Sequence, residues 1–182
     1  MDKTQTIALF GGSFDPPHIG HENIVKALLD LDYINKVVVM PTFLNPFKSN
    51  SHAPANLRLH WLKVIFEKFN DVEISDFEVN QKEKTPTIKS VEYLLSKYSK
   101  IYLVIGADNL ESLHKWHDYD KLMKRVSLVV ATRDDINIDD FSCKLKIMDD
   151  ISSTKLRKNI DISKLSQPCA DEIFKYYEEA LS

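Results

Sequence analysis

The sequence predicts an α/β fold, in which a parallel sheet is covered by helices on both of its faces. Short apolar runs typical of buried strands alternate along the 182 residues with segments whose apolar side chains recur at helical spacing. Such alternation favours parallel strands, because each helix returns the chain to the same edge of the sheet. We therefore expect a Rossmann-like, doubly wound sheet, built as a single domain that spans residues 1–182.

The expected elements follow from β-prone apolar runs and from amphipathic spacing. Strands are expected at residues 7–10, 36–40, 72–79, 101–105, 126–131 and 144–148. Helices are expected at residues 18–31 and 57–66, after a Thr87 cap, after a Ser153 or Thr154 cap, and at 168–181. Three of the strands end in Phe10-Gly11-Gly12, Met40-Pro41 and Ile105-Gly106. Since ligands of such sheets bind beyond the carboxyl ends of the strands, we expect one nucleotide-sized site there.

Composition narrows the class of protein. The formal net charge of −3 argues against a dedicated nucleic-acid binder, which usually has a strong basic excess. No apolar run approaches the roughly 20 residues of a membrane helix, and the first residues do not resemble a signal peptide. The two cysteines are too few for a disulfide scaffold or a zinc site, so we expect a reducing, cytoplasmic setting. The sequence leaves open whether the chain forms a homo-oligomer.

Glycine usage indicates where the site lies. The chain has four glycines, where average usage would give roughly 13. Three of them lie in the string GGSFDPPHIGH, residues 11–21, which we expect to turn from a strand into a helix. His18 and His21 lie three residues apart at the start of that helix, where free N–H groups favour phosphate. The alternatives are two ordinary surface or capping histidines, or a zinc site that no neighbouring Cys, Asp or Glu cluster completes.

Three motifs carry a family resemblance. GGSFDPPHIGH resembles the signature of the nucleotidyltransferases that transfer adenylate from ATP, and ISSTKLR, residues 151–157, is similar to their second signature. Between them, IGADNLESLHKW, residues 105–116, resembles the segment particular to the nicotinate-nucleotide adenylyltransferase family. The resemblance implies adenylate transfer from ATP to nicotinate mononucleotide, with Mg²⁺ carried by ATP and no protein metal site. It implies no nucleic-acid or membrane partner.

The resemblance also implies roles for individual residues. It implies that catalysis rests on His18, His21, Lys48 and Arg157. It implies that ATP is bound by Gly11, Gly12, Ser13, Phe14, His18, His21, Gly106, Asp108, Ser153, Thr154 and Arg157. It implies that the mononucleotide is bound by Asp15, Thr87 and Trp116, with the Trp116 ring stacked on the pyridine.

The sequence leaves two other functions open. Phosphopantetheine adenylyltransferases have the same two ATP motifs, although the Pro-Pro-His sequence and the segment 105–116 disfavour them. A nucleotide-sensing module without turnover is the alternative from another class; it is disfavoured because His18, His21, Lys48 and Arg157 are all present. The sequence does not distinguish nicotinate from nicotinamide mononucleotide.

Overall fold

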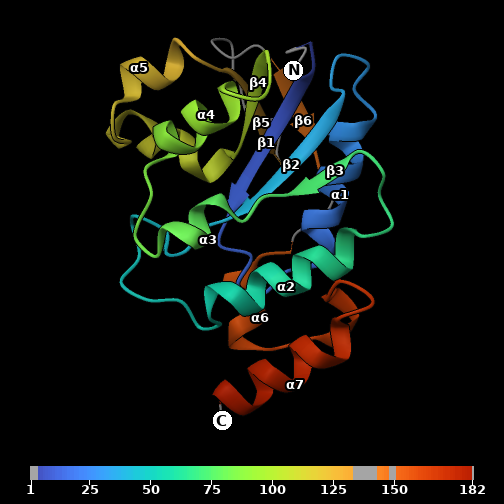
Figure 1. The fold of residues 1–182 in the computed structure, drawn as a ribbon. Coiled ribbons are helices and arrows are strands. Elements are labelled where there is room, and N and C mark those ends of the chain that lie inside the picture. The colour runs from blue at the N-terminus through green and yellow to red at the C-terminus, as the bar shows by residue number, and fades with distance from the viewer. Residues whose placement is uncertain (1–3, 133–142, 148–150, 182) are drawn as a thin grey trace.

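The structure, a computed structural model, describes residues 4–132, 143–147 and 151–181. Within these ranges it confirms the predicted parallel sheet, whose six strands lie in the order β3-β2-β1-β4-β5-β6 (Figure 1). The strands are β1 (Thr6–Gly12), β2 (Lys36–Pro41), β3 (Val72–Ile74), β4 (Lys100–Gly106), β5 (Ser127–Thr132) and β6 (Cys143–Lys146). Strand order reverses between β1 and β4, so the carboxyl ends of these two strands form the expected ligand-binding edge.

The helices of the described residues cover both faces and the carboxyl edge of this sheet. They are α1 (Ile19–Leu29), α2 (Ala55–Phe66), α3 (Phe77–Gln81), α4 (Thr87–Leu95), α5 (Tyr119–Met123), α6 (Ser153–Lys158) and α7 (Ala170–Leu181), with 3-10 helices η1 (Ala107–Lys115) and η2 (Ile162–Lys164). Figure 1 shows α2, α6 and α7 beyond the carboxyl ends of the strands. None of these helices is long and apolar enough to cross a membrane.

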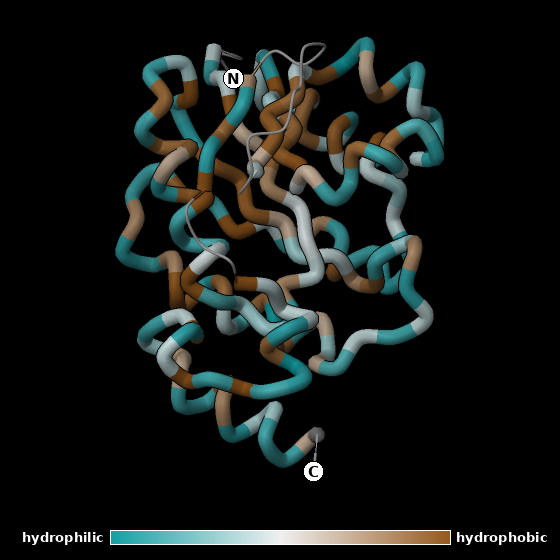
Figure 2. The backbone as a smooth tube through the Cα atoms, turned by 180° about the vertical axis from the view of Figure 1, so that it is seen from behind, coloured by the Kyte–Doolittle hydropathy of each residue, from teal (hydrophilic) through white to brown (hydrophobic). Residues whose placement is uncertain are grey.

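Alternate residues of each central strand enter two separate hydrophobic cores. In β1, Ala8 and Phe10 pack with α1, α2 and α7, whereas Ile7 and Leu9 pack with α4 and η1. Both faces are therefore buried, which explains why the strand reads as a continuous apolar run. Figure 2 shows these hydrophobic strands at the centre of the molecule and hydrophilic residues around them.

The structure corrects the expected strand at residues 72–79. Strand β3 ends at Ile74, and Phe77–Gln81 forms helix α3. The Phe77 ring stacks on Tyr93 of α4, with centroids 4.1 Å apart, which holds this short helix against the next one. A short alternating pattern fits either element, and tertiary packing decides between them.

Two expected helix caps are also displaced by one residue. Pro86, not Thr87, occupies the N-cap position of α4. Ser152, not Ser153 or Thr154, caps α6, because its hydroxyl accepts a hydrogen bond from the Lys155 N–H at 3.2 Å. The helical segments η1 and α5 were not expected from the sequence, and Met148 of the expected last strand lies outside the described residues. Because Thr87 and Ser153 do not cap these helices, their side chains make other contacts: Ser153 donates to the Pro16 carbonyl at 2.9 Å, and Thr87 lines a pocket described below.

Candidate active site

The turn after β1 depends on Phe14 and on Gly12. Phe14 has a φ of 49°, in the left-handed region, and its ring is buried. A Cβ on Gly12 would lie 3.2 Å from that ring, so the tight approach favours glycine. At Gly11, by contrast, a Cβ would be 3.9 Å from the nearest atom, so the protein itself leaves room there. The Phe14 ring packs edge-on against His21, with centroids 4.8 Å apart.

His18 and His21 form a stacked pair at the N-terminus of α1. Their ring centroids are 3.6 Å apart and their planes differ by 23°. The backbone N–H of His18 donates a hydrogen bond to Nδ1 of His21 at 3.2 Å. Because Nδ1 accepts, a neutral His21 carries its proton on Nε2. A Cβ on Gly20 would lie 3.0 Å from the His18 ring, so the absent side chain lets this ring pack closely against the helix.

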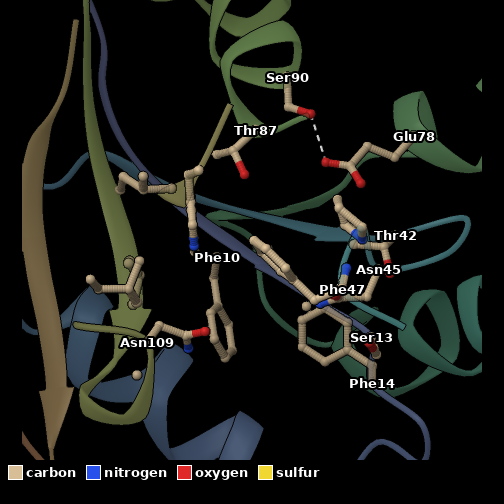
Figure 3. Close-up of a pocket in the computed structure, with 18 of the residues that line it drawn as sticks. Phe10, Ser13, Phe14, Thr42, Asn45, Phe47, Glu78, Thr87, Ser90 and Asn109 are labelled. Carbon is tan, nitrogen blue, oxygen red and sulfur yellow. Dashed lines mark hydrogen bonds between the residues drawn. The ribbon is translucent and has the colours of Figure 1, made fainter. Parts of the chain in front are cut away.

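Two adjoining pockets open at the carboxyl edge of the sheet. The first, of about 490 Å³, is shown in Figure 3. The second has a volume of about 410 Å³ and extends over Ile24 of α1 and Thr132 at the end of β5. Both are lined by Phe10, His21, Gly106, Asp108 and Ser153. A ligand that fills both pockets would therefore pass His21 at their junction.

Gly106 and Asp108 lie close together where β4 leads into η1. A Cβ on Gly106 would be 2.4 Å from Oδ1 of Asp108, and Asn109 donates to the same oxygen at 3.3 Å. The exposed Asp108 carboxylate can thus stand over the end of β4 only because residue 106 is glycine. Asp108 occupies the first turn of η1.

The predicted phosphate-contacting residues approach from two sides. Lys48, on the loop after β2, lines the first pocket and donates to Ser13 Oγ at 3.4 Å. Burial lowers the pKa of its ammonium group, and the positive charge of Arg157 adds to that effect. Arg157 donates from Nη1 to the carbonyl of Asp15 and from Nη2 to Thr154 Oγ1 at 3.2 Å. Ser153 and Thr154 line the first pocket, whereas Arg157 lines neither.

Of the three residues predicted to bind the mononucleotide, Thr87 and Trp116 line the first pocket. The structure does not bring the Asp15 side chain to that pocket. Asp15 is 2% exposed, and its carboxylate accepts hydrogen bonds from the backbone N–H groups of His52 and Ala53 and from the Tyr177 hydroxyl. Burial by itself raises the pKa of Asp15, but these hydrogen bonds outweigh it and lower the pKa below its usual value. Asp15 thereby joins three distant segments.

Sequence reasoning missed Arg58, which is fully buried in α2. Its guanidinium donates hydrogen bonds to the backbone carbonyls of Ser13, Thr42, Phe43 and Ala53. These carbonyls belong to the loops that leave β1 and β2, so one side chain holds both loops around the first pocket. An arginine within an amphipathic pattern gives no local sign that it is buried.

Three further polar groups of the first pocket were also missed or only partly foreseen. Glu78 of α3 is 6% exposed, and one of its carboxyl oxygens accepts from the Ser90 hydroxyl at 2.6 Å. Glu78 Oε2, Thr42 Oγ1 and Trp116 Nε1 are buried and have no hydrogen-bond partner among the residues that the structure describes. Buried polar atoms are usually paired, so these three mark places where a ligand can complete the hydrogen bonding.

Comparison with known proteins agrees with this geometry. A cytidylyltransferase-like family model matches residues 9–159, which places the chain among the nucleotidyltransferases of this class. A probable nicotinate-nucleotide adenylyltransferase of Sulfurimonas denitrificans is 57% identical over 174 residues, covering 96% of each chain. A probable enzyme of the same name from Nitratiruptor is 46% identical over 94% of this chain and 98% of its own. The chain belongs to the nicotinate-nucleotide adenylyltransferase family.

A solved structure supports the same fold. The Plasmodium falciparum nicotinic acid mononucleotide adenylyltransferase, complexed with NaAD, superposes with a TM-score of 0.77. It covers 97% of both chains at 22% sequence identity. The fold is therefore kept where most of the sequence differs.

Proposed function

We propose that the chain transfers adenylate from ATP to nicotinate mononucleotide, releasing nicotinate adenine dinucleotide and pyrophosphate in NAD biosynthesis. The observation that carries this proposal is that His21 lies at the junction of two pockets of nucleotide size. Two relatives that align over 96% and 94% of this chain are named as probable enzymes of this kind, which supports the same conclusion.

The two pockets suit the two halves of the dinucleotide. We assign the adenosine of ATP to the second pocket, where Gly106 and Asp108 can approach its ribose. The nicotinate mononucleotide takes the first pocket, where Thr87 and Trp116 lie. The reacting phosphates then meet beside His21 and the N-terminus of α1, where the positive end of the helix dipole favours negative charge.

The proposed reaction needs alignment and charge neutralisation rather than a general base. An oxygen of the mononucleotide phosphate bonds to the α-phosphorus of ATP, and the bond from that phosphorus to the bridging oxygen breaks. Pyrophosphate leaves with the electron pair. The attacking phosphate is already ionised near neutral pH. We assign the His21 Nε2–H as a donor to a phosphate oxygen, with charge from Lys48 and Arg157 and with Mg²⁺ entering as part of the substrate Mg²⁺–ATP.

The test measures pyrophosphate release with ATP and each of three acceptors: nicotinate mononucleotide, nicotinamide mononucleotide and phosphopantetheine. We expect release with nicotinate mononucleotide, and loss of that release in His21→Ala. His114→Ala is the matched control, because His114 is exposed and lines neither pocket. Release with phosphopantetheine alone would assign the chain to the other adenylyltransferase.

A nucleotide-sensing role would show itself differently. ATP would bind, and no pyrophosphate would be released with any acceptor.

We propose that the protein works in the cytoplasm, where the free thiols of Cys143 and Cys169 would stay reduced.

A further inference from the structure

Glu78 lines the first pocket, and one of its carboxyl oxygens is buried without a hydrogen-bond partner among the described residues. It lies on α3, and Figure 3 shows its carboxyl group on the pocket wall, joined to Ser90 by a hydrogen bond. The Ser90 hydroxyl, itself fully buried, donates to Oε1 at 2.6 Å. Oε2 is buried and has no partner among the described residues, although the residue lines an open pocket. A group that enters the pocket, whether a ligand or a water molecule, can supply a partner for this oxygen.

The surroundings of Glu78 favour its neutral form. Burial raises its pKa to about 7, against which the Ser90 hydrogen bond acts as a smaller, lowering effect. Near neutral pH the side chain is therefore divided between the acid and the carboxylate. Among the described residues, the other titratable groups that line this pocket are His21, Lys48, Asp108 and His117. The side chains that hydrogen-bond to its loops are those of Asp15, Arg58, Lys84 and Arg157.

The neutral acid would make this part of the pocket rich in donors. Because Oε1 accepts from Ser90, the proton of the acid lies on Oε2, which then becomes a donor. Trp116 Nε1, a donor only, and the Thr42 hydroxyl line the same pocket and also lack partners among the described residues. Donor groups that lack hydrogen-bond partners complement a ligand group that can only accept hydrogen bonds. A carboxylate is such a group, whereas a carboxamide brings N–H donors of its own.

We propose that Glu78 distinguishes the acid from the amide of the pyridine ring. In this proposal, which rests on the proposed function, the neutral carboxyl of Glu78 donates from Oε2 to the carboxylate of nicotinate mononucleotide. The ionised carboxyl of Glu78 repels that carboxylate and instead accepts from the N–H₂ group of nicotinamide mononucleotide. Binding of the acid substrate therefore holds one proton on Glu78 at pH values where the free protein has lost it.

Calorimetric titration tests this proton directly. Nicotinate mononucleotide is titrated at pH 8 into protein that is saturated with a non-hydrolysable ATP analogue, in buffers that differ in ionisation enthalpy. We expect uptake of close to one proton per mononucleotide bound. Nicotinamide mononucleotide is the reference ligand, since it has the same phosphate, whose second pKa lies near 6; we expect it to take up none.

Two variants separate Glu78 from its surroundings. Glu78→Gln keeps an acceptor for Ser90 and an N–H donor in place of Oε2, but it does not titrate. We expect this variant to bind nicotinate mononucleotide without proton uptake. The control is Glu83→Gln, because Glu83 is exposed and pairs with Lys89 at 3.7 Å outside the pocket; its proton uptake should match that of the natural protein.

Steady-state kinetics give an independent measure. The ratio of kcat/KM for the acid to kcat/KM for the amide should fall roughly tenfold for each pH unit above the pKa of Glu78, and it should be flat in Glu78→Gln. Effects of pH on ATP, on the substrate phosphate and on His21 or Lys48 cancel in this ratio. Zero proton uptake in the natural protein, or uptake that persists in Glu78→Gln, would overturn the proposal. Absence of pyrophosphate release with both mononucleotides would instead overturn the proposed function.

Discussion

The backbone N–H of His18 donates to Nδ1 of His21, and the two imidazole rings stack 3.6 Å apart. This arrangement uses Nδ1 of His21 to close the first turn of α1, and we propose Nε2 as the donor to a ligand. Nδ1 of His21 thus has a structural role and Nε2 has the proposed functional role, and substitutions can separate these two roles.

His21→Asn is expected to abolish most of the activity while leaving the fold intact. The Asn side chain places an acceptor oxygen near the position of Nδ1, so it can keep the hydrogen bond from His18. It has no group at the position of Nε2. Loss of one preorganised donor lowers kcat by about 10²–10³-fold in other enzymes, and we expect a fall of that order. Steady-state pyrophosphate release and thermal unfolding measure the two effects, and a variant with near-normal kcat would exclude His21 from catalysis.

Gly106→Ala is expected to weaken ATP binding through Asp108. The added Cβ would lie 2.4 Å from Asp108 Oδ1, so the carboxylate must rotate away from its present position. Because only the end of a short side chain has to move, we expect the unfolding free energy to change by about 1 kcal/mol or less. The KM for ATP should rise, whereas the KM for the mononucleotide should change little. An unchanged KM for ATP would contradict the assignment of Asp108 to the adenosine site.

Arg58→Met is expected to destabilise the protein strongly. The substitution leaves the carbonyls of Ser13, Thr42, Phe43 and Ala53 without their shared donor in a buried position. Loss of such a network costs about 3–5 kcal/mol. Urea unfolding measures the difference, with Arg125→Met as the control, because Arg125 is exposed and its loss should cost about 0.5 kcal/mol or less. Equal effects of the two substitutions would contradict the role given to Arg58.

Asp15→Asn is expected to reveal a pH-dependent contribution to stability. The pKa of Asp15 is lowered in the folded protein from the ordinary value of 3.8, so the carboxylate stabilises the fold above that value. The contribution is lost as the pH falls through the folded-state pKa. The natural protein should therefore exceed the variant in unfolding free energy by a constant amount between about pH 5 and 7, and by less at lower pH. Denaturant titrations across this range measure the difference, and a gap that widened on acidification would reverse the sign of the effect.

Local patterns were sufficient to predict the sheet, and they place the candidate site at its carboxyl edge, where the two pockets lie. The apolar runs predicted the central strands. Both faces of these strands are buried, so nearly every residue in them is apolar and the run is visible in the sequence. The glycines at 11, 12, 20 and 106 lie at the pocket or next to the histidines, as their scarcity indicated. The limits of β3 and the caps at Pro86 and Ser152 depend on packing, which a local window does not contain.

The polar interior could not be predicted in the same way. Arg58 and Glu78 are charged residue types in segments of ordinary composition, and only contacts made by distant parts of the chain bury them. The family resemblance implies that Asp15 binds the mononucleotide. Its position instead follows from partners at His52, Ala53 and Tyr177, which no local spacing links to it.

The Asp15–Tyr177 hydrogen bond also determines the order in which the molecule can be completed during synthesis. The two residues are 162 positions apart, so the turn after β1 leaves the ribosome long before Tyr177 has been translated. Until α7 folds back, the Asp15 carboxylate lacks the hydrogen bond from Tyr177. Assembly of this turn is thus completed only after α7 has been synthesised, not as the N-terminal motif emerges.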